Sequence, residues 1–190
     1  MARLALPLAT PRLQLREFVR ADLESLGAVA DHWRVREFAP ADSRALGAAR
    51  RTMAGRRHGP RRSYEFAVVV RRSGKLIGAC DLALAGRREA DIGYMLAPRH
   101  WGFGYGTEVA AALVDFGFRQ LALERLSAVV AIENERSRRV LGNAGLVWEG
   151  LMRRAFRIAG RSWDCHRYTI DRPRWLARQP PCAAPAARGS

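Results

Sequence analysis

The sequence predicts one α+β domain in which an antiparallel meander of strands leads into a βαβ crossover. The chain has 190 residues, close to the size of a single domain. Three strand signals divided by turn residues follow one another over residues 65–96. A helical stripe over 108–121 then leads to an apolar strand over 125–132. The elements do not alternate regularly as they would in a doubly wound fold.

Composition and charge fit a globular cytoplasmic protein with an anionic partner. The chain is 48% hydrophobic and 27% charged, and it has no apolar run of about 18 residues, so we expect neither disorder nor a membrane span. Its N-terminal apolar patch is too short for a signal peptide. With 33 basic and 18 acidic residues, the net charge of +15 favours phosphates, RNA or acidic protein segments. Three widely spaced cysteines indicate a reducing compartment, and four histidines without ligand spacing predict no metal site.

The N-terminal part reads as a strand, a helix and a basic segment. Alternating apolar residues over 12–16 predict a half-buried strand, and apolar residues at helical spacing over 22–33 predict a helix. Residues 40–62 are rich in Ala and Arg, and their glycines and Pro60 break the periodicity. We expect a short helix followed by a basic loop there.

The remaining chain reads as strands around two helices. Turn residues end each strand of the meander, and the run Ser-Ala-Val-Val-Ala-Ile is typical of a strand buried on both faces. Asn134 is a good N-cap for a short helix that ends near 143–145. The predicted strands are 65–70, 75–84, 91–96, 125–132, 146–157 and 161–170, and the predicted helices begin at 108 and 134. We place the domain at 1–172 and expect the Pro/Ala-rich residues 173–190 to be a disordered tail.

Residues 102–107, the glycine loop, carry the strongest chemical signal. The surrounding segment 99–108 reads Arg-His-Trp-Gly-Phe-Gly-Tyr-Gly-Thr-Glu, leaves a predicted strand and enters the next helix. Glycines let the backbone approach a ligand, and the first helical turn offers unpaired N–H groups, so a pyrophosphate is the expected guest. The spacing fits neither a Rossmann fingerprint nor a P-loop. A turn that only caps the helix is the alternative.

Six short motifs occur in order between residues 11 and 150. They are P-R-L-x-L-R at 11–16, G-K-L-I-G at 74–78, I-G-Y-M-L at 92–96, W-G-F-G-Y-G-T-E at 101–108, N-E-R-S at 134–137 and G-L-V-W-E-G at 145–150. In this order and spacing they resemble the GCN5-related N-acetyltransferase (GNAT) family, within it the RimJ/RimL-like branch of ribosomal-protein N-terminal acetyltransferases. The resemblance covers residues from about 12 to 170.

This resemblance implies a GNAT fold, with a mixed, mostly antiparallel seven-stranded sheet flanked by helices. The sheet would be splayed between its fourth strand, 91–96, and its fifth, 125–132, with the co-substrate acetyl-CoA in the gap and no metal. Backbone groups at 94–96 would pair with the pantetheine arm, and the amides of the glycine loop would hold the pyrophosphate. The implied coenzyme-binding residues are Tyr94, Met95, Leu96, Gly102, Phe103, Gly104, Tyr105, Gly106, Thr107 and Asn134.

The resemblance also implies direct acetyl transfer to a primary amine in a ternary complex. Many relatives place a tyrosine acid where this chain has Leu141, whereas the ribosomal-protein branch has a serine that matches Ser137. Ser137 could protonate the leaving thiolate or hydrogen-bond to its sulfur. It also occupies the third helical position, where a polar side chain simply supports the helix start.

The general base is open at this point. Some relatives have a glutamate where this chain has Phe156, which cannot titrate. The remaining candidates are Glu149, Asp91 and Asp81, each of which could equally be a surface carboxylate. Water that relays the proton to solvent is another alternative.

The acceptor is expected to be a protein N-terminal α-amine, acidic or associated with the ribosome. In the family the segment that covers the acceptor corresponds here to residues 44–62, and six arginines within 50–62 could recruit an anionic target or reflect codon bias. The alternatives are a small-molecule amine or aminoglycoside as acceptor, and a non-catalytic CoA- or RNA-binding module. A homodimer is also possible.

Overall fold

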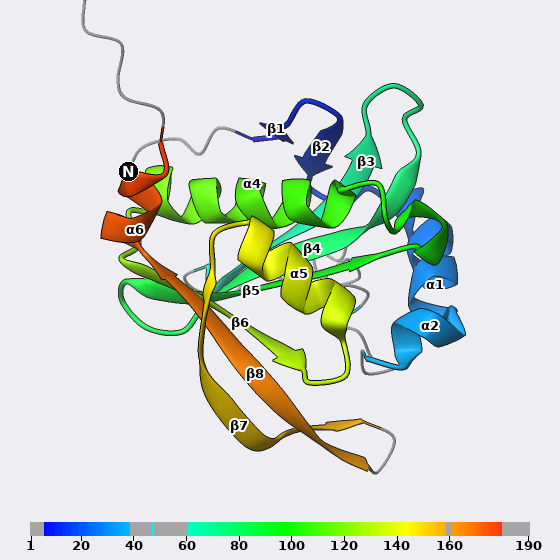
Figure 1. Cartoon of the computed structure of the whole chain (residues 1–190). Helices are drawn as coiled ribbons and strands as arrows, with labels where there is room; N and C mark the ends of the chain where they lie inside the picture. Colours follow the sequence, from blue (N-terminus) through cyan, green and yellow to red (C-terminus); the bar gives the residue numbers. More distant parts are fainter. Residues whose placement is uncertain (1–5, 39–46, 48–60, 159–160, 180–190) are drawn as a thin grey trace, which may run out of the picture.

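The computed structural model describes residues 6–38, 47, 61–158 and 161–179, which form one eight-stranded sheet with helices on both faces (Figure 1). The strand order is β1-β2-β3-β4-β5-β6-β8-β7. Only β5 and β6 run parallel, and every other neighbouring pair is antiparallel. The strands are β1 Leu8–Ala9, β2 Leu13–Arg16, β3 Ser63–Val70, β4 Leu76–Leu84, β5 Glu89–Leu96, β6 Arg125–Ala131, β7 Val147–Ile158 and β8 Arg161–Asp171.

The predicted α+β class, the meander and the mixed sheet are confirmed, but the expected strand number of seven is wrong. The extra strand is β1, which pairs with β2 through Leu8 opposite Leu15 and Ala9 opposite Gln14. Two residues are too short to show a periodicity of two in the sequence. The pairing buries Leu8 against the core at that edge of the sheet.

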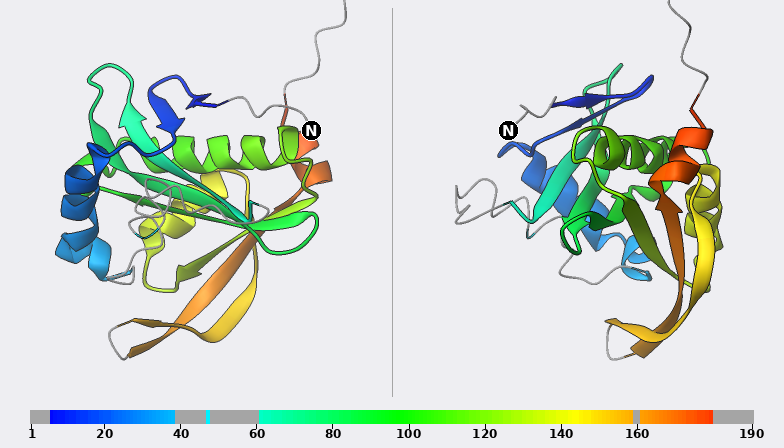
Figure 2. Two further views of the ribbon diagram at one scale, coloured as in Figure 1. Left: turned by 180° about the vertical axis from the view of Figure 1, so that it is seen from behind. Right: turned by 90° about the vertical axis from the view of Figure 1, so that its left-hand side faces the viewer.

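Helices cover the two faces of the sheet unequally (Figure 2). The long helix α4 lies across one face together with α5, and α1 packs on the other face. Alternate residues of β4 show this division, because Cys80 and Leu82 belong to the core under α4 whereas Ala79 packs with Leu26 of α1. The helices are α1 Asp22–Asp31, α2 Trp33–Arg36, the 3₁₀ helix η1 Pro98–His100, α4 Tyr105–Arg119, α5 Glu135–Asn143 and α6 Arg172–Ala177.

The helix predicted over 22–33 is two helices. His32 has an extended backbone (φ −64°, ψ 127°), which ends α1. Its side chain accepts a hydrogen bond from the Arg34 amide at 3.2 Å and so caps the start of α2. Capping by a histidine is uncommon, and the helical spacing of the apolar residues does not reveal it.

The sequence places the start of the expected disordered tail too early, at residue 173. Residues 172–177 form α6, with Asp171 as N-cap and Pro173 in the first turn, where proline is well tolerated. Trp175 is buried against the core, and its indole N–H donates to Asp115 at 2.6 Å. The domain therefore extends beyond residue 172, and residues 180–190 of the expected tail lie outside the described part of the chain.

None of the helices in the described part of the chain is both long enough and apolar enough to cross a membrane.

Candidate functional site

The sheet opens at its centre, between β5 and β6. The two strands pair over only three residues, Glu89–Asp91 with Arg125–Ser127. Beyond them β5 stays paired with β4 up to Leu96, and β6 stays paired with β8 up to Ala131. The facing edges of β5 and β6 therefore diverge, as the predicted splay requires. An extended ligand can pair with such an edge as another strand would.

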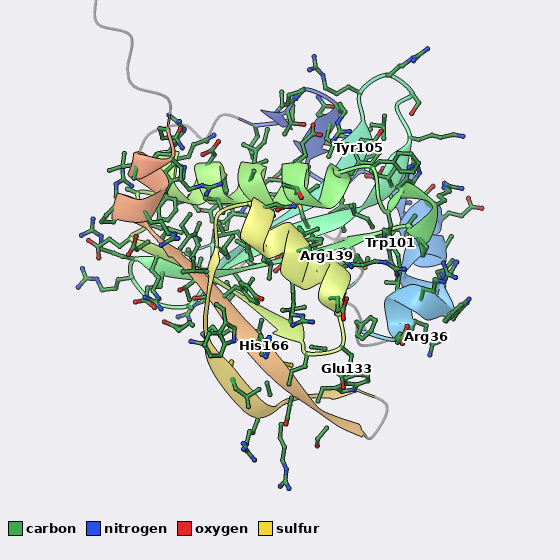
Figure 3. All side chains as sticks on the ribbon, viewed as in Figure 1. Arg36, Trp101, Tyr105, Glu133, Arg139 and His166 are labelled. Atoms are coloured by element: carbon green, nitrogen blue, oxygen red, sulfur yellow. The ribbon has the colours of Figure 1, made fainter. Side chains whose placement is uncertain are left out.

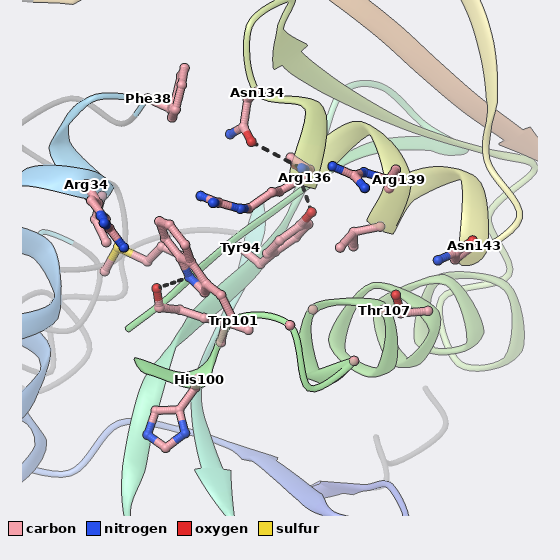
Figure 4. Close-up of a pocket in the computed structure, with 18 residues that line it drawn as sticks. Arg34, Phe38, Tyr94, His100, Trp101, Thr107, Asn134, Arg136, Arg139 and Asn143 are labelled. Atoms are coloured by element: carbon pink, nitrogen blue, oxygen red, sulfur yellow. Dashed lines mark hydrogen bonds between the residues drawn. The ribbon is translucent and has the colours of Figure 1, made fainter. Parts of the chain in front are cut away.

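A pocket of about 490 Å³ lies at this opening, between the end of β5, the glycine loop, α5 and α2 (Figure 4). It brings together eight of the ten expected coenzyme-binding residues, namely Tyr94, Met95, Leu96, Gly102, Gly104, Gly106, Thr107 and Asn134. The other two, Phe103 and Tyr105, do not line it. The Phe103 side chain is 63% exposed, and the Tyr105 ring lies under the guanidinium of Arg12. These two residues are expected to bind the pyrophosphate through their backbone amides, and this role does not depend on where their side chains lie.

The glycine loop needs glycine at three positions for two reasons. Gly102 (φ 83°) and Gly104 (φ 78°) have left-handed backbones that other residues rarely adopt. At Gly106 a Cβ atom would stand 3.1 Å from Val140 of α5, so the missing side chain lets α4 and α5 approach each other. Gly104 is the N-cap of α4, and no side chain hydrogen-bonds to the cap. The first-turn amides are therefore available to an anion, which the helix dipole also favours.

Two hydrogen bonds link Asn134, Ser137 and Tyr94 on the wall made by β5 and α5. The Asn134 side-chain oxygen accepts from the Ser137 amide at 3.1 Å, as expected for an N-cap. The Ser137 hydroxyl lies 2.8 Å from the phenol oxygen of Tyr94 (Figure 4). At the position of the missing family tyrosine, Leu141 is buried in the core. A different tyrosine thus meets the predicted serine, 43 residues away in the sequence.

The Tyr94 phenol is held in its protonated form. Burial raises its pKa to about 12, although the hydrogen bond with Ser137 acts in the opposite direction. The phenol therefore keeps its proton at neutral pH and can donate it in a hydrogen bond.

Cationic side chains surround the pocket, and none of the described residues that line it is an aspartate or glutamate. Arg34 comes from α2, and Arg136 and Arg139 come from α5. His100 of η1 also lines the pocket, but burial and the nearby Arg99 and Lys75 lower its pKa, which favours the neutral imidazole. Arg136 lies 5.3 Å from the ring centre of Trp101, whose indole N–H donates to the Leu96 carbonyl at 2.8 Å. Figure 3 shows Arg139 on α5 and Trp101 between this helix and α1. The lining therefore favours an anionic ligand.

Sequence reasoning did not identify these arginines or Trp101 as site residues. Arg136 and Arg139 share a helix with Asn134 and Ser137, and their spacing of three residues could have shown that they lie on one face. Arg34 gives no such signal, because only the three-dimensional packing brings α2 to the pocket.

The structure does not bring two of the predicted catalytic carboxylates into the pocket. Glu149 on β7 forms an ion pair with Arg125 and is not among the lining residues. Asp91 lies opposite Ser127 in the last parallel pair, at the base of the split. Of the three predicted catalytic residues, only Ser137 lines the pocket.

Carboxylates occupy the opposite face of the sheet beside the split. Asp81 lies on the same face as Ala79, which packs with α1, and its carboxylate covers Gly93. A Cβ atom on Gly93 would stand 2.8 Å from this carboxylate. Glu65 is directly opposite Asp81 in the β3–β4 ladder, and Asp91 is two residues before Gly93. Among the described residues, acidic groups thus lie beside the split on this face, whereas none lines the pocket.

The basic segment 44–62 lies outside the described residues, apart from Gly47, Arg61 and Arg62. Arg61 is not a free surface charge. Its guanidinium contacts Glu17 at 3.3 Å and stands 4.4 Å from the ring centre of Tyr64. Within the part of the chain that the structure describes, no three His, Cys, Asp or Glu side chains gather as a metal site would require.

Comparison with known proteins agrees with this geometry. Residues 12–147 match the family model described as the acetyltransferase (GNAT) domain. The uncharacterized N-acetyltransferase YoaA of Bacillus subtilis is 37% identical over 116 residues, which are 60% of this chain and 66% of that protein. The spermidine N(1)-acetyltransferase of Vibrio cholerae is 31% identical over 91 residues, 48% of this chain and 53% of that one.

Among solved structures, RimJ of Mycobacterium smegmatis in complex with CoA-disulfide superposes with a TM-score of 0.70 at 25% identity. The superposition covers 87% of this chain and 88% of that one. The chain spans 60–66% of the length of the first curated relatives it matches. The similarity thus extends over most of this chain in structure and over little more than half of it in sequence.

Proposed function

Because this chain belongs to the GNAT acetyltransferase family, we propose that it transfers the acetyl group of acetyl-CoA to the α-amine of a protein N-terminus. The observation that carries the proposal is the pocket at the split between β5 and β6. This pocket combines an open strand edge, uncapped helix amides and a half-buried pair of hydroxyl groups.

The residues present fit CoA as a ligand. Its pyrophosphate would accept hydrogen bonds from the amides of the glycine loop at the start of α4. The pantetheine arm would lie along the free edge of β5 near Tyr94–Leu96, with Asn134 as a further polar contact. Arg136 and Arg139 add positive charge at the same opening, which favours a polyanionic coenzyme.

Ser137 and Tyr94 would act on the sulfur that leaves. Acetyl-CoA supplies the thioester, and transfer to an amine places negative charge on the sulfur. If the Tyr94 hydroxyl donates a hydrogen bond to the Ser137 oxygen, the Ser137 hydroxyl hydrogen is free to point into the pocket. An ordinary thiol has a pKa of about 8.5, well below that of either hydroxyl, so the pair would stabilise the thiolate by hydrogen bonding rather than lose a proton to it.

The amine would lose its proton on the α1 side of the split. Asp81 and Asp91 lie on that face, next to the point where the strands separate. Either carboxylate could accept the proton directly or through water. Glu149 fits this task less well, because Arg125 already pairs with it.

The choice of acceptor rests on charge. A peptide N-terminus carries one amine and a polar backbone, and an acidic peptide would be attracted by Arg34 of α2, which lines the same opening as the arginines assigned to CoA. A polyamine would bring several positive charges to a pocket whose described lining contains no carboxylate. We therefore rank an acidic or neutral N-terminal peptide first.

A polyamine is the second candidate, and one observation favours it. Glu65, Asp81 and Asp91 form an acidic strip on the α1 side of the sheet, where a cation could bind. One relative is named spermidine N(1)-acetyltransferase. In that case the acceptor would approach from the acidic side and avoid the arginines.

A panel of acceptors separates these possibilities. Release of free CoA thiol is followed with acidic, neutral and basic N-terminal peptides, spermidine and an aminoglycoside at equal concentration. We expect the highest kcat/KM with acidic or neutral peptides, and a fall with added salt for the acidic ones. A preference for spermidine would transfer the assignment to the second candidate. Tight CoA binding without turnover of any amine would instead indicate a non-catalytic module.

A further inference from the structure

Arg12 reaches from the start of β2 to the glycine loop. Its backbone N–H donates to Glu108 at 2.8 Å, and its Nε–H donates to the other oxygen of the same carboxylate at 2.6 Å. Its Nη1 donates to the Phe103 carbonyl at 2.7 Å, and its guanidinium lies 4.6 Å from the ring centre of Tyr105. Figure 3 shows Tyr105 at the end of α4 that lies beside β2. One side chain thus contacts the loop at Phe103 and Tyr105 and the first turn of α4 at Glu108.

The contact with Phe103 determines how the next amide points. In a trans peptide the C=O and the following N–H point in opposite directions. Since the Phe103 carbonyl points to Arg12, the Gly104 N–H points away from Arg12. Gly104 lines the pocket and Arg12 does not, so this contact leaves the Gly104 N–H available to a ligand in the pocket.

The contact with Glu108 removes a competing charge. Glu108 lies in the first turn of α4, where a carboxylate is attracted to the helix N-terminus in the same way as a phosphate. Burial alone would raise its pKa, but hydrogen bonds from Thr10 and Arg12 outweigh burial and hold the pKa below its usual value. The carboxylate therefore stays ionised, with Arg12 as its counter-charge and Thr10 as a further donor at 2.5 Å.

We propose that Arg12 is a positioning residue, which holds the glycine loop with its amides toward the pyrophosphate of CoA and neutralises Glu108 beside that anion. The inference rests on the proposed function, because it assumes that CoA is the ligand. Gly104 contributes to the same arrangement, since a Cβ atom there would stand 3.3 Å from Arg12 Nη2.

The test compares two acetyl donors that differ in the part the loop would hold. Acetyl-CoA carries the pyrophosphate, and S-acetylpantetheine does not. In Arg12→Ala we expect kcat/KM for acetyl-CoA to fall about tenfold to a hundredfold, the scale of a lost hydrogen bond to a charged group, mainly through KM. With S-acetylpantetheine we expect less than a twofold change. The ratio of the two donors on one preparation is independent of the fraction that folds.

Two further variants make the outcome specific. Arg71→Ala is the matched control, because Arg71 donates to the Thr10 carbonyl at 2.9 Å in the same turn and does not contact the glycine loop in the described structure. It should leave the donor ratio unchanged. In Arg12→Ala/Glu108→Gln the unpaired carboxylate is gone, and we expect part of the lost acetyl-CoA affinity to return.

Equal losses with both donors, or none with either, would overturn the positioning role. Calorimetry with CoA on the unmodified protein separates a failure of the positioning role from a failure of the proposed function. If the unmodified protein does not bind CoA, the proposed function itself is wrong.

Discussion

At the scale of single residues, the proposed chemistry depends on two hydroxyl groups. Tyr94 and Ser137 lie 2.8 Å apart, and Tyr94→Phe removes one hydroxyl while the ring stays. We expect kcat to fall about tenfold, since the Ser137 hydroxyl loses the partner that orients it, with KM for acetyl-CoA little changed. Ser137→Ala should cost about 10²–10³ in kcat, the range for removing one hydrogen-bond donor that stabilises developing negative charge.

The double variant tests whether the two act as one unit. Because Tyr94 acts through Ser137, Tyr94→Phe/Ser137→Ala should be no slower than Ser137→Ala alone. Tyr64→Phe, in the core against Phe116, is the matched control and should retain its kcat. Additive losses in the double variant would mean that Tyr94 reaches the substrate directly.

The pH dependence of folding gives a second view of Tyr94. Its pKa is near 10 in an unfolded chain and about 12 in the folded protein. The folded state therefore holds the phenol proton more tightly than the unfolded chain does. The protonated Tyr94 contributes fully to stability below pH 10, and this contribution disappears as the pH rises through 12. Urea unfolding between pH 9 and 12 should show a steeper loss of stability in the unmodified protein than in Tyr94→Phe. Parallel curves would exclude the raised pKa.

The sequence predicts single residues well only where the signal is local. Asn134 as an N-cap and the glycines of the loop follow from neighbours in the chain, and the structure has them in these roles or conformations. The Tyr94–Ser137 contact joins a strand to a helix 43 residues later. No periodicity states which side chains of two such elements will touch, so this pair could not be predicted.

At the scale of elements, the junction of β2 with α1 depends on a buried ion pair. Asp22, 5% exposed, accepts from both terminal nitrogens of Arg16 and from the Val19 amide. Burial acts to raise its pKa, but these hydrogen bonds outweigh burial and lower it. The contribution to stability is therefore present above the unfolded pKa of about 3.9 and lost as the pH falls through the lower folded value.

Asp22→Asn should destabilise the protein by about 2 kcal/mol at pH 7, the scale of hydrogen bonds to charged groups. The difference from the unmodified protein should disappear in acid, below the folded pKa of Asp22. Chemical denaturation at pH 7 and at successively lower pH values follows this decrease in the difference. A difference that does not depend on pH would indicate a packing effect rather than the ion pair.

The last helix shows why the boundaries of elements were harder to predict than the elements themselves. The meander, α4 and α5 have clear periodicity and were predicted within a few residues, whereas α6 has six residues and begins at a proline. A short helix is stable mainly through tertiary contacts, here the packing of Trp175 on Phe118 at 5.2 Å between ring centres. The sequence alone does not show that contact.

Trp175→Ala measures how much α6 contributes. The side chain is 5% exposed, and its removal should cost about 3–5 kcal/mol of unfolding free energy. Leu176→Ala on the same helix is the control, since Leu176 is 54% exposed and its removal should cost well under 1 kcal/mol. Similar values for both variants would mean that α6 is not part of the folded domain.

At the scale of the whole molecule, a split sheet places the glycine loop and a pair of hydroxyl groups around one opening. The parallel pairing of β5 and β6 ends at Asp91, and α4, which connects these two strands, begins beside the opening with uncapped amides. The crossover that joins the strands therefore also carries the glycine loop, at which we propose the phosphate site. The central claim is that this opening binds acetyl-CoA through the glycine loop.

Calorimetric titration of acetyl-CoA into the unmodified protein and into Gly104→Val tests this claim most directly. Gly104 has a φ of 78°, which a β-branched residue adopts only with strain, and its Cβ would press on Arg12. We expect saturable binding to the unmodified protein and none to the variant, with circular dichroism and a melting curve to show that the variant is folded. Equal affinity in a folded Gly104→Val, or no binding to the unmodified protein, would contradict the account.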